Sequence, residues 1–439
     1  MPPGAAPFTA CASLCGAMRC PAACRLQAMT QDIRINGERL WDSLMVMAKI
    51  GATQRGGCNR QALTDEDKQG RDLFANWCRD AGCTVSVDEM GNMFARRPGR
   101  NADAPPVITG SHLDTQPTGG KFDGVYGVLA GLEVLRTLDE AGIETDASLE
   151  VVVWTNEEGA RFAPAMVGSG VWSGEMQRDE VYAIEDKAGK RFGEELERIG
   201  YRGDLPAQPR PIRAAFEAHI EQGPILEAEA LQIGILTGVQ GARWYDLTIE
   251  GQPVHAGPTP MALRRDPFMG ALPILEYCYE LAAQYAPWGR ATFGDINAEP
   301  GSRNTVPERL IVNVDLRHPD PAVLDEMDHL FRTFVAETCE AKNLQGRVAE
   351  LWHMPVTEFD PDCVDAVRSA TAELGYSNME MVSGAGHDAL YVAKVAPTSM
   401  IFVPCKDGVS HNEAEDAKPD DLEAGCNVLL HAMLRMAKA

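Results

Sequence analysis

The stretch Ser148-Leu-Glu-Val-Val-Val-Trp-Thr155 is the clearest fold signal in the sequence, because a continuous apolar run of this length is typical of a strand buried on both faces. The amphipathic segment 125–139 before it predicts a helix, and residues 106–109 predict a shorter buried strand. Residues 64–81 predict another helix behind a Thr64 cap. Strands that alternate with helices predict an α/β domain with a mixed, largely parallel sheet, whose active groups gather at the carboxyl ends of the strands.

The rhythm changes near Gln240, where continuous apolar runs give way to alternation. The elements expected there are a strand at 244–250, a helix at 267–285 kinked at Pro273, strands at 291–298 and 309–316, a helix at 321–342 and a strand at 346–353. The order β-α-β-β-α-β predicts an inserted ferredoxin-like α+β unit.

The α/β pattern resumes after Pro355, with a strand at 400–404 and a closing helix at 419–436. We therefore expect a catalytic domain built from residues 29–238 and 355–439. The inserted residues 239–354 would form a lid and dimerisation domain.

Charge and composition exclude several classes of function. The 439 residues carry 40 Lys and Arg against 64 Asp and Glu, so the net charge is 40 − 64 = −24. Nucleic-acid and anionic-membrane binders need clustered Lys and Arg, and no such cluster occurs here. No apolar window approaches the roughly 20 residues that a membrane-spanning helix needs. These features predict a protein with neither nucleic-acid nor membrane partners.

The first 28 residues differ from the rest in composition, and they hold Cys11, Cys15, Cys20 and Cys24. We interpret them as a disordered tail or an over-extended start, and expect the functional chain to begin at Met29. A signal peptide is disfavoured because no basic region precedes the apolar residues. A zinc site is disfavoured because no Cys-x-x-Cys pair occurs among the four. The other eight cysteines are scattered along the chain, which is typical of a reducing cytoplasm.

Histidines and carboxylates follow the predicted strands. They are His112 and Asp114 in Gly110-Ser-His-Leu-Asp114, Asp123 in Lys121-Phe-Asp-Gly124, the pair Glu157 and Glu158, His219 in Glu217-Ala-His-Ile-Glu-Gln222, and His411 in Gly408-Val-Ser-His-Asn-Glu413. A single such residue is more often a satisfied polar group than a ligand. Five groups at predicted strand ends favour one common site.

Imidazole and carboxylate ligands without thiolates suit zinc, manganese or cobalt, and a carboxylate can bridge two metals. We expect Asp123 to be that bridge. Asp114 would hold the far ring nitrogen of His112. Glu158 would bind metal while Glu157 accepts the proton of the attacking water, because a ligand cannot also accept a proton freely.

Together these motifs resemble the M20 (aminoacylase-type) metallopeptidase family, specifically its hydantoinase/carbamoylase branch. The resemblance runs from about Ile33 to the C-terminus and is most specific at Thr109–Thr115, Thr155–Gly159 and Ser383–Asp388. It implies a two-metal hydrolase in which His112, Asp123 and His219 hold one metal and Asp123, Glu158 and His411 hold the other. It also implies that Glu157 is the general base.

The inserted unit contributes a second set of residues. By the same resemblance, His255 reaches the neighbouring subunit's site and stabilises the oxyanion, which predicts a homodimer. Gln222, Asn304 and Arg317 would clamp a substrate carboxylate, since arginine offers a bidentate fork to such a group. The roles of Arg303 and His387 stay open: His387 could line the pocket or stabilise its loop. A thiol nucleophile is disfavoured, because Cys405 and Cys426 have no nearby motif histidine.

Three hypotheses follow. The first is a binuclear amidohydrolase that acts on N-carbamoyl-L-amino acids or N-carbamoyl-β-alanine, with allantoate as the alternative small anionic ureido substrate. The second is an aminoacylase or peptidase of the same fold. The third is a non-catalytic metal-stabilised binding protein, which the presence of Glu157 disfavours.

Overall fold

The computed structural model describes residues 32–438. The expectations for the cysteine-containing tail and for a start near Met29 lie outside these residues. The chain divides into the units 1–34 and 35–439, and every helix and strand named below belongs to the second. Among the described residues, no helix combines the length and the apolar character needed to cross a membrane.

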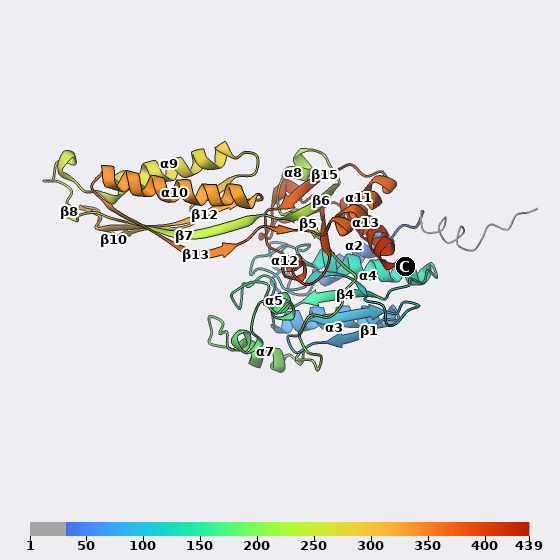
Figure 1. Cartoon of the computed structure of the whole chain (residues 1–439). Helices are drawn as coiled ribbons and strands as arrows, with labels where there is room; N and C mark the ends of the chain where they lie inside the picture. The colour runs from blue at the N-terminus through green and yellow to red at the C-terminus, as the bar shows by residue number, and fades with distance from the viewer. Residues whose placement is uncertain (1–31, 439) are drawn as a thin grey trace, which may run out of the picture. The chain divides into compact units, whose positions relative to one another are not determined.

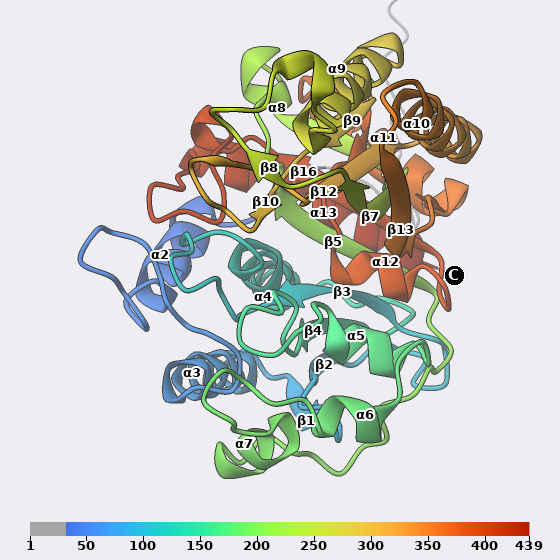
Figure 2. The same ribbon diagram turned by 90° about the vertical axis from the view of Figure 1, so that its left-hand side faces the viewer.

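A nine-stranded mixed sheet forms the centre of this unit, in the order β1-β2-β4-β3-β5-β16-β6-β14 with β15 also paired to β6. Figure 2 shows β1, β2, β4, β3 and β5 in this order. The four strands in its middle, β4, β3, β5 and β16, are parallel, as the sequence predicts. The flanking pairs β1–β2, β2–β4, β16–β6 and β6–β14 are antiparallel. The strands are β1 Thr84–Val87, β2 Met93–Arg97, β3 Val107–His112, β4 Leu149–Trp154, β5 Ala214–Ile220, β6 Ile233–Val239, β14 Thr357–Glu358, β15 Asn378–Ser383 and β16 Thr398–Val403.

Helices cover both faces of this sheet, and the alternation along β4 shows which helices cover which face. Val151 lies under Gly131 of α4. Its neighbour Val152 belongs to a core cluster with Trp172 of α5 and Val392 of α12. Successive strand residues point to opposite faces, so α4 and α12 lie on opposite sides. The helices of this part are α2 Gly37–Met47, α3 Asp65–Asp80, α4 Val125–Glu140, α5 Val167–Trp172, α6 Arg178–Tyr182, α7 Phe192–Arg198, α8 Ile225–Ala228, α11 Pro361–Leu374, α12 Asp388–Val392 and α13 Pro419–Ala437.

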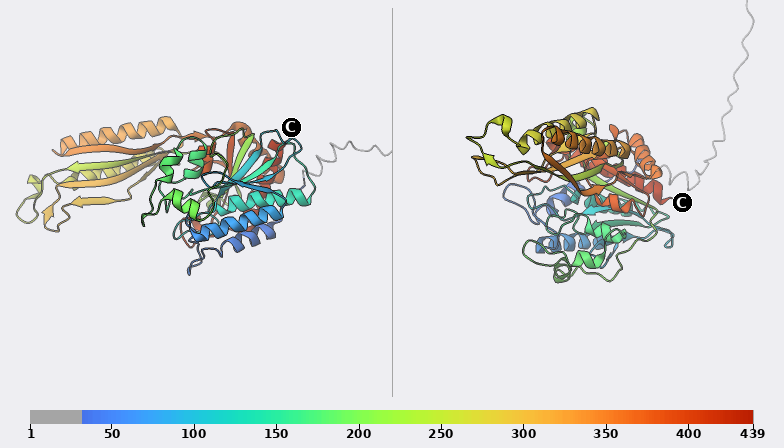
Figure 3. Two further views of the ribbon diagram at one scale, coloured as in Figure 1. Left: turned by 90° about the horizontal axis from the view of Figure 1, so that it is seen from below. Right: turned by 60° about the vertical axis from the view of Figure 1, so that its left-hand side comes forward.

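A second, antiparallel sheet occupies the segment where the sequence rhythm changes. Its order is β10-β12-β7-β13, with β9 also paired to β12. The helices α9 and α10 lie along one face and pack on it through a shared apolar core, and Figures 1 and 3 show the other face without a helix. The elements are β7 Gly241–Glu250, α9 Pro267–Gln284, β9 Arg290–Thr292, β10 Ile296–Glu299, β12 Arg309–His318, α10 Pro321–Ala341 and β13 Gln345–Met354. Pro273 lies inside α9, and the helix continues past it.

One expectation for this sheet is wrong. Residues 291–298 are not a single strand, because the chain leaves the ladder between β9 and β10, and both short strands pair with β12. The break contains Gly294 and Asp295, which are residue types that strands disfavour. The two-residue strands β8 Val254–His255 and β11 Thr305–Val306 also pair with each other, and the sequence pattern does not predict this ribbon.

Candidate metal centre

The central parallel strands bring the predicted ligands to one edge of the sheet. His112 is the last residue of β3, and His219 is the second-last residue of β5. Glu157 and Glu158 follow β4, and His411 lies in the loop after β16. The carboxyl ends of parallel strands meet at the same edge, so these side chains converge as expected.

Asp123 lies at the centre of this cluster. Its Oδ1 is 3.2 Å from Nε2 of His219 and 3.5 Å from Nε2 of His112. Its Oδ2 is 3.3 Å from Nε2 of His411, and that nitrogen is 3.4 Å from Oε2 of Glu158. The two oxygens therefore face two donor groups that could each hold a metal ion, His112–Asp123–His219 and Asp123–Glu158–His411.

Both buried histidines are oriented by backbone carbonyls. The Nδ1 of His219 lies 2.9 Å from the carbonyl oxygen of Ile220, and the Nδ1 of His112 lies 2.8 Å from that of Asp114. A carbonyl oxygen only accepts hydrogen bonds, so each Nδ1 carries a hydrogen and each Nε2 points to Asp123. This orientation is the usual arrangement of a metal-binding histidine.

The expectation for the Asp114 carboxylate is therefore corrected. Its Oδ1 is 3.9 Å from Nδ1 of His112, because the backbone carbonyl oxygen of Asp114 already accepts the hydrogen bond from that nitrogen. Instead, the two carboxylate oxygens accept the backbone N–H groups of Glu157 and Glu158, each at 3.2 Å. Asp114 thus fixes the turn after β4 that presents both glutamates.

Two residues that sequence reasoning missed hold the carboxylate ligands in place. Gln116 grips both oxygens of Glu158: its backbone N–H donates to Oε1 at 3.0 Å and its side-chain amide donates to Oε2 at 2.7 Å. Buried Glu415 accepts the backbone N–H groups of Phe122 and Asp123 at 2.9 and 3.1 Å. Its position four residues after His411, just past the Gly408–Glu413 motif, is the one sequence signal that could have revealed it.

Ser410 links Glu415 to Asp123. The Ser410 hydroxyl lies 3.1 Å from Oδ2 of Asp123 and 3.1 Å from Oε2 of Glu415. A hydroxyl has one hydrogen to donate, so it can serve only one of these carboxylates at a time unless the other is protonated.

Gly124 lets the Asp123 turn lie against the ring of His112. Its φ is +67°, and a Cβ at this position would lie 2.3 Å from Nε2 of His112. A side chain would therefore meet both an unfavourable backbone conformation and a steric clash. The glycine allows α4 to start beside the ligands.

The charge balance of the cluster suits cations. Burial raises the pKa of Glu157 well above its usual range and raises the pKa values of Glu158 and Glu415 to about 7. Burial also raises the pKa of Asp123, but its hydrogen bonds with His112, His219 and His411 outweigh this and hold the pKa well below the usual range. The site thus gathers more carboxylates than its histidines can neutralise. Bound divalent cations would offset this excess, so the donor set fits such ions.

Glu157, the predicted base, is buried and lies beside the first donor group. Its Oε2 is 3.4 Å from Nε2 of His112. Burial lowers the pKa of His112, but the charges of Glu157, Asp123 and Asp114 outweigh this and raise it well above the usual value. The Glu157 carboxylate thus lies directly beside the His112–Asp123–His219 group.

The residues expected to bind the substrate carboxylate lie in different places. The Gln222 side chain is at the metal centre, where its amide donates to Oδ2 of Asp123 at 2.8 Å. Arg317 lies on β12 and donates from Nη1 to the carbonyl oxygen of Gly384 at 3.0 Å, next to the His387 loop. Asn304 and His255 are exposed and lie at the β8–β11 ribbon. Within 32–438, no hydrogen bond or ion pair joins these last two side chains to the donor groups.

His387 is buried and supports its own loop. Its Nε2 is 3.1 Å from the hydroxyl of Ser383, and its ring centroid is 4.5 Å from that of His219. Burial and the neighbouring His219 hold its pKa well below the usual range. The observed hydrogen bond of His387 thus stabilises its own loop. Arg303 is exposed, and its role stays open.

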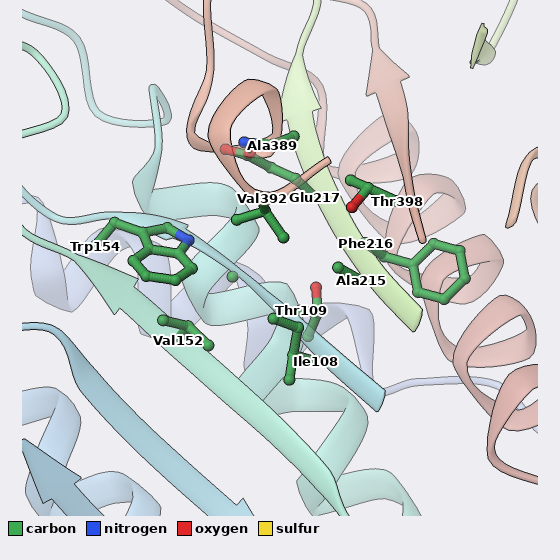
Figure 4. Close-up of a pocket in the computed structure, with 11 residues that line it drawn as sticks. Ile108, Thr109, Val152, Trp154, Ala215, Phe216, Glu217, Ala389, Val392 and Thr398 are labelled. Atoms are coloured by element: carbon green, nitrogen blue, oxygen red, sulfur yellow. Dashed lines mark hydrogen bonds between the residues drawn. The ribbon is translucent and has the colours of Figure 1, made fainter. Parts of the chain in front are cut away.

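Glu217 lies behind His219 and also contributes to a third donor group with His219 and His387. Its carboxylate accepts the hydroxyl of Ser111 at 2.6 Å and the backbone N–H of Ala389 at 3.0 Å. Figure 4 shows the small pocket next to it, between the sheet and α12. The lining is mostly apolar, so this pocket is a packing gap and lies apart from the ligands at the strand ends.

The cysteines of the described region take no part in the site. All eight are buried and free. Burial raises the pKa of Cys405 to about 12, and it raises the pKa of Cys426 well above the usual range. Neither would form a thiolate nucleophile near neutral pH.

Comparisons with known proteins agree with the motifs. Residues 108–435 match the model of peptidase family M20/M25/M40. The chain is 49% identical over 413 residues to an N-carbamoyl-L-amino-acid amidohydrolase from Rhizobium meliloti, covering 94% of this chain and 99% of that one. It is 32% identical to an allantoate amidohydrolase from Escherichia coli, covering 90% and 97%. A crystal structure of a hydantoinase/carbamoylase family amidase from Burkholderia multivorans superposes with a TM-score of 0.90 at 56% identity, covering 93% and 99%. The resemblance stated from the motifs is confirmed.

Proposed function

Because this chain belongs to peptidase family M20/M25/M40, we propose that it is a binuclear metal-dependent amidohydrolase that cleaves the ureido C–N bond of N-carbamoyl-L-amino acids or N-carbamoyl-β-alanine. The products would be the amino acid, ammonia and carbon dioxide. Its relatives are named as amidohydrolases, and the chain is a hydrolase of carbon–nitrogen bonds other than peptide bonds. The substrate and the two-metal mechanism are the proposal.

The position of Asp123 carries this proposal. Its two oxygens face two donor groups, so one residue can serve two cations. His112 and His219 would complete one group, and Glu158 and His411 the other. Divalent cations in these groups would supply Lewis acidity toward water and toward the ureido carbonyl. Zinc, manganese and cobalt all suit the nitrogen and oxygen donors, and availability decides between them.

Glu157 would move the proton. Its Oε2 would accept a proton from the attacking water and then deliver it to the amino-acid nitrogen as the C–N bond breaks, which releases the amino acid and carbamic acid. Carbamic acid would then decompose to ammonia and carbon dioxide. The Asp114 carboxylate holds the backbone of Glu157, which keeps the base in place without occupying its oxygens. The nucleophile would be water, so the side chains of the site would position and deprotonate that water, and none of them would itself attack the ureido carbonyl.

Recognition of the substrate carboxylate would fall to Gln222, Asn304 and Arg317. The guanidinium of Arg317 can present two parallel N–H groups to a carboxylate. We further propose that the inserted unit acts as a lid and dimerisation domain, and that His255 completes the site of a partner subunit by stabilising the oxyanion. Its exposure on the β8–β11 ribbon supports a role toward a second chain.

The proposed setting is the cytoplasm. The eight cysteines within residues 32–438 are free and buried, which suits a reducing compartment. No nucleic-acid partner is proposed, because the net charge of −24 opposes one.

The test is a panel of four substrates after separate reconstitution with zinc, manganese or cobalt. The panel is N-carbamoyl-L-methionine, N-carbamoyl-β-alanine, allantoate and an N-acetyl amino acid, with ammonia or free amine as the measured product. We expect ammonia from at least one N-carbamoyl amino acid. Cleavage of allantoate alone would make the chain an allantoate amidohydrolase, the function named for the Escherichia coli relative. Cleavage of the acetyl compound alone would favour an aminoacylase.

A further inference from the structure

An exposed pair of tryptophans lies on the helix-free face of the second sheet. Trp244 on β7 is 44% exposed and Trp352 on β13 is 40% exposed. They are cross-strand partners, and their ring centroids are 4.6 Å apart. The neighbouring β7 residues Tyr245 and Leu247 face the helices, so Trp244 points away from them. Two adjacent indoles left open to solvent indicate a recognition surface.

This pair lies beside the arginine expected to receive the substrate carboxylate. Trp244 is directly opposite Asp315 on β12, two residues before Arg317. The Asp315 carboxylate accepts Nε of Arg317 at 3.0 Å and Nη2 at 2.7 Å. These hydrogen bonds hold the guanidinium of Arg317 next to Asp315, the residue opposite Trp244. Diagonal neighbours on one face of a sheet are close enough for aromatic and long side chains to touch.

The arginine also keeps an open edge. Its contacts use the Nε hydrogen, one hydrogen on Nη2 for Asp315, and one on Nη1 for the carbonyl oxygen of Gly384. A guanidinium has five N–H groups, so one hydrogen remains on each Nη atom. Both of these hydrogens are free to donate to a substrate carboxylate. The indoles of Trp244 and Trp352 and the two free N–H groups of Arg317 thus form one amphipathic surface.

We infer that Trp244 and Trp352 receive the side chain of an N-carbamoyl-α-amino acid whose carboxylate lies on Arg317, so that the enzyme prefers substrates with aromatic or large apolar side chains. This inference rests on the proposed ureido hydrolysis. In an α-amino acid the side chain and the carboxylate leave the same carbon, so a substrate held on the fork places its side chain within reach of the neighbouring indoles.

The three candidate substrate classes differ at this surface. N-carbamoyl-β-alanine has no side chain to bury against the indoles. Allantoate carries a second ureido group, which is polar and would lose hydration against an apolar surface. An aromatic or large aliphatic side chain gains from burial and, if aromatic, from ring stacking. The surface therefore favours N-carbamoyl-L-amino acids over the other two classes.

The test compares kcat/KM for N-carbamoyl-L-phenylalanine with kcat/KM for N-carbamoylglycine in the metal-loaded enzyme. We expect a ratio of at least about tenfold in the natural protein, falling close to one in Trp244→Ala and in Trp352→Ala. Trp244→Phe should restore most of the ratio because it keeps an aromatic face. Ile311→Ala is the matched control: Ile311 faces the same side of the same sheet, opposite Thr248 and farther from Arg317, and its loss should leave the ratio high.

Failure of this inference can be told apart from failure of the proposed function. A ratio near one in the natural protein, or a ratio that survives both alanine variants, would overturn the side-chain site while ureido hydrolysis stands. The side-chain site would also be overturned if an alanine variant changed its sedimentation but kept the natural kcat/KM ratio. The indoles would then be covered by a second copy of the chain. Absence of ammonia release from every ureido compound would overturn the proposed function and the side-chain site together.

Discussion

The backbone N–H and the side-chain amide of Gln116 donate to different oxygens of Glu158, at 3.0 and 2.7 Å. A single residue thus fixes the plane of a carboxylate that is expected to bind metal. Glu158 also lies 3.4 Å from His411, the more exposed ligand of its group. The Asp123–Glu158–His411 group therefore depends on Gln116 for its geometry.

Replacing Gln116 with Leu should weaken this group selectively. The backbone donor remains, but Oε2 of Glu158 loses its partner and the carboxylate can rotate. We expect the affinity for one of two cations to fall about 10- to 100-fold, the usual range for a lost partner of a metal ligand. The measurement is metal content per chain during titration with a chelator. Replacing the exposed Gln69 of α3 with Leu is the control, and equal weakening of both cations in Gln116→Leu would contradict a selective role.

Glu157→Gln tests the base apart from the ligands. The substitution keeps the size and removes the proton acceptor, while the Asp114 bond to the backbone N–H at position 157 is unaffected. We expect kcat to fall by about 10²- to 10⁴-fold with both cations retained. Wild-type turnover in this variant would refute the assigned role, and loss of metal would show that Glu157 is a ligand instead.

Gly124→Ala should damage the metal centre, and Gly142→Ala provides a matched comparison. Both glycines have positive φ, +67° and +62°, but only at Gly124 would a new Cβ meet the ring of His112. Gly142→Ala should cost about 1–2 kcal/mol of stability from the backbone alone and should bind metal normally. Gly124→Ala should lose more stability and also lose the cation held by His112. Calorimetric unfolding and metal analysis separate the two effects, and normal metal content in Gly124→Ala would contradict the steric argument.

The convergence of ligands could be predicted, because it follows from two simple properties of the chain. Apolar runs before His112 and Glu157 mark buried strands, and the carboxyl ends of parallel strands meet. The second sheet was predicted for a similar reason, since its strands alternate. The break between β9 and β10 was missed, because Gly294 and Asp295 weaken a strand without ending its apolar pattern.

The supporting contacts of the site could not be predicted from the sequence. Asp114 orients His112 through a backbone carbonyl, and a sequence pattern specifies only side chains. Glu415 and Gln116 are of residue types that usually lie exposed in surface loops. Gln116 contacts Glu158 across 42 residues of sequence, and Glu415 contacts Phe122 and Asp123 across 293 and 292 residues, so both sets of contacts form only when the chain folds.

Asp88 should make stability depend on pH. This carboxyl lies away from the metal centre, and burial raises its pKa to about 7 despite hydrogen bonds from Asn92 and Met90. The unfolded chain has a pKa near 3.9 for Asp, so the folded state binds the proton more tightly. The stabilisation from protonation is complete below about pH 4 and is lost as pH rises through 7, with a slope of up to about 1.4 kcal/mol per pH unit.

Asp88→Asn removes that titration. Natural protein and variant should be compared by denaturant unfolding at pH 5 and pH 8, with the same metal loading, so that the other buried carboxyls cancel. We expect the natural protein to be more stable relative to the variant at pH 5 than at pH 8. The asparagine side chain introduced at this position would also lie against the donating amide of Asn92, which changes stability at every pH. The readout is therefore the change with pH in the stability difference, and not its size at one pH. A stability difference that is the same at both pH values would show that Asp88 is ionised throughout.

The proposed role of His255 in a partner subunit can be tested by mixing two inactive variants. His255→Ala should lack the oxyanion donor, and Glu157→Gln should lack the base, so each homodimer should be nearly inactive. In a mixed dimer, one site combines the intact Glu157 of one subunit with the intact His255 of the other. Random exchange gives half mixed dimers with one restored site in two, so activity should recover to about a quarter of the natural level.

The alternative predicts a different outcome from the same mixture. If His255 served its own subunit, every site would lack either the base or the oxyanion donor, and mixing would restore nothing. Separate samples of each variant, carried through the same exchange procedure, set the background. Recovery that rises with the extent of exchange would also establish that the active species is at least a dimer. An active monomer in analytical ultracentrifugation would refute the partner role directly.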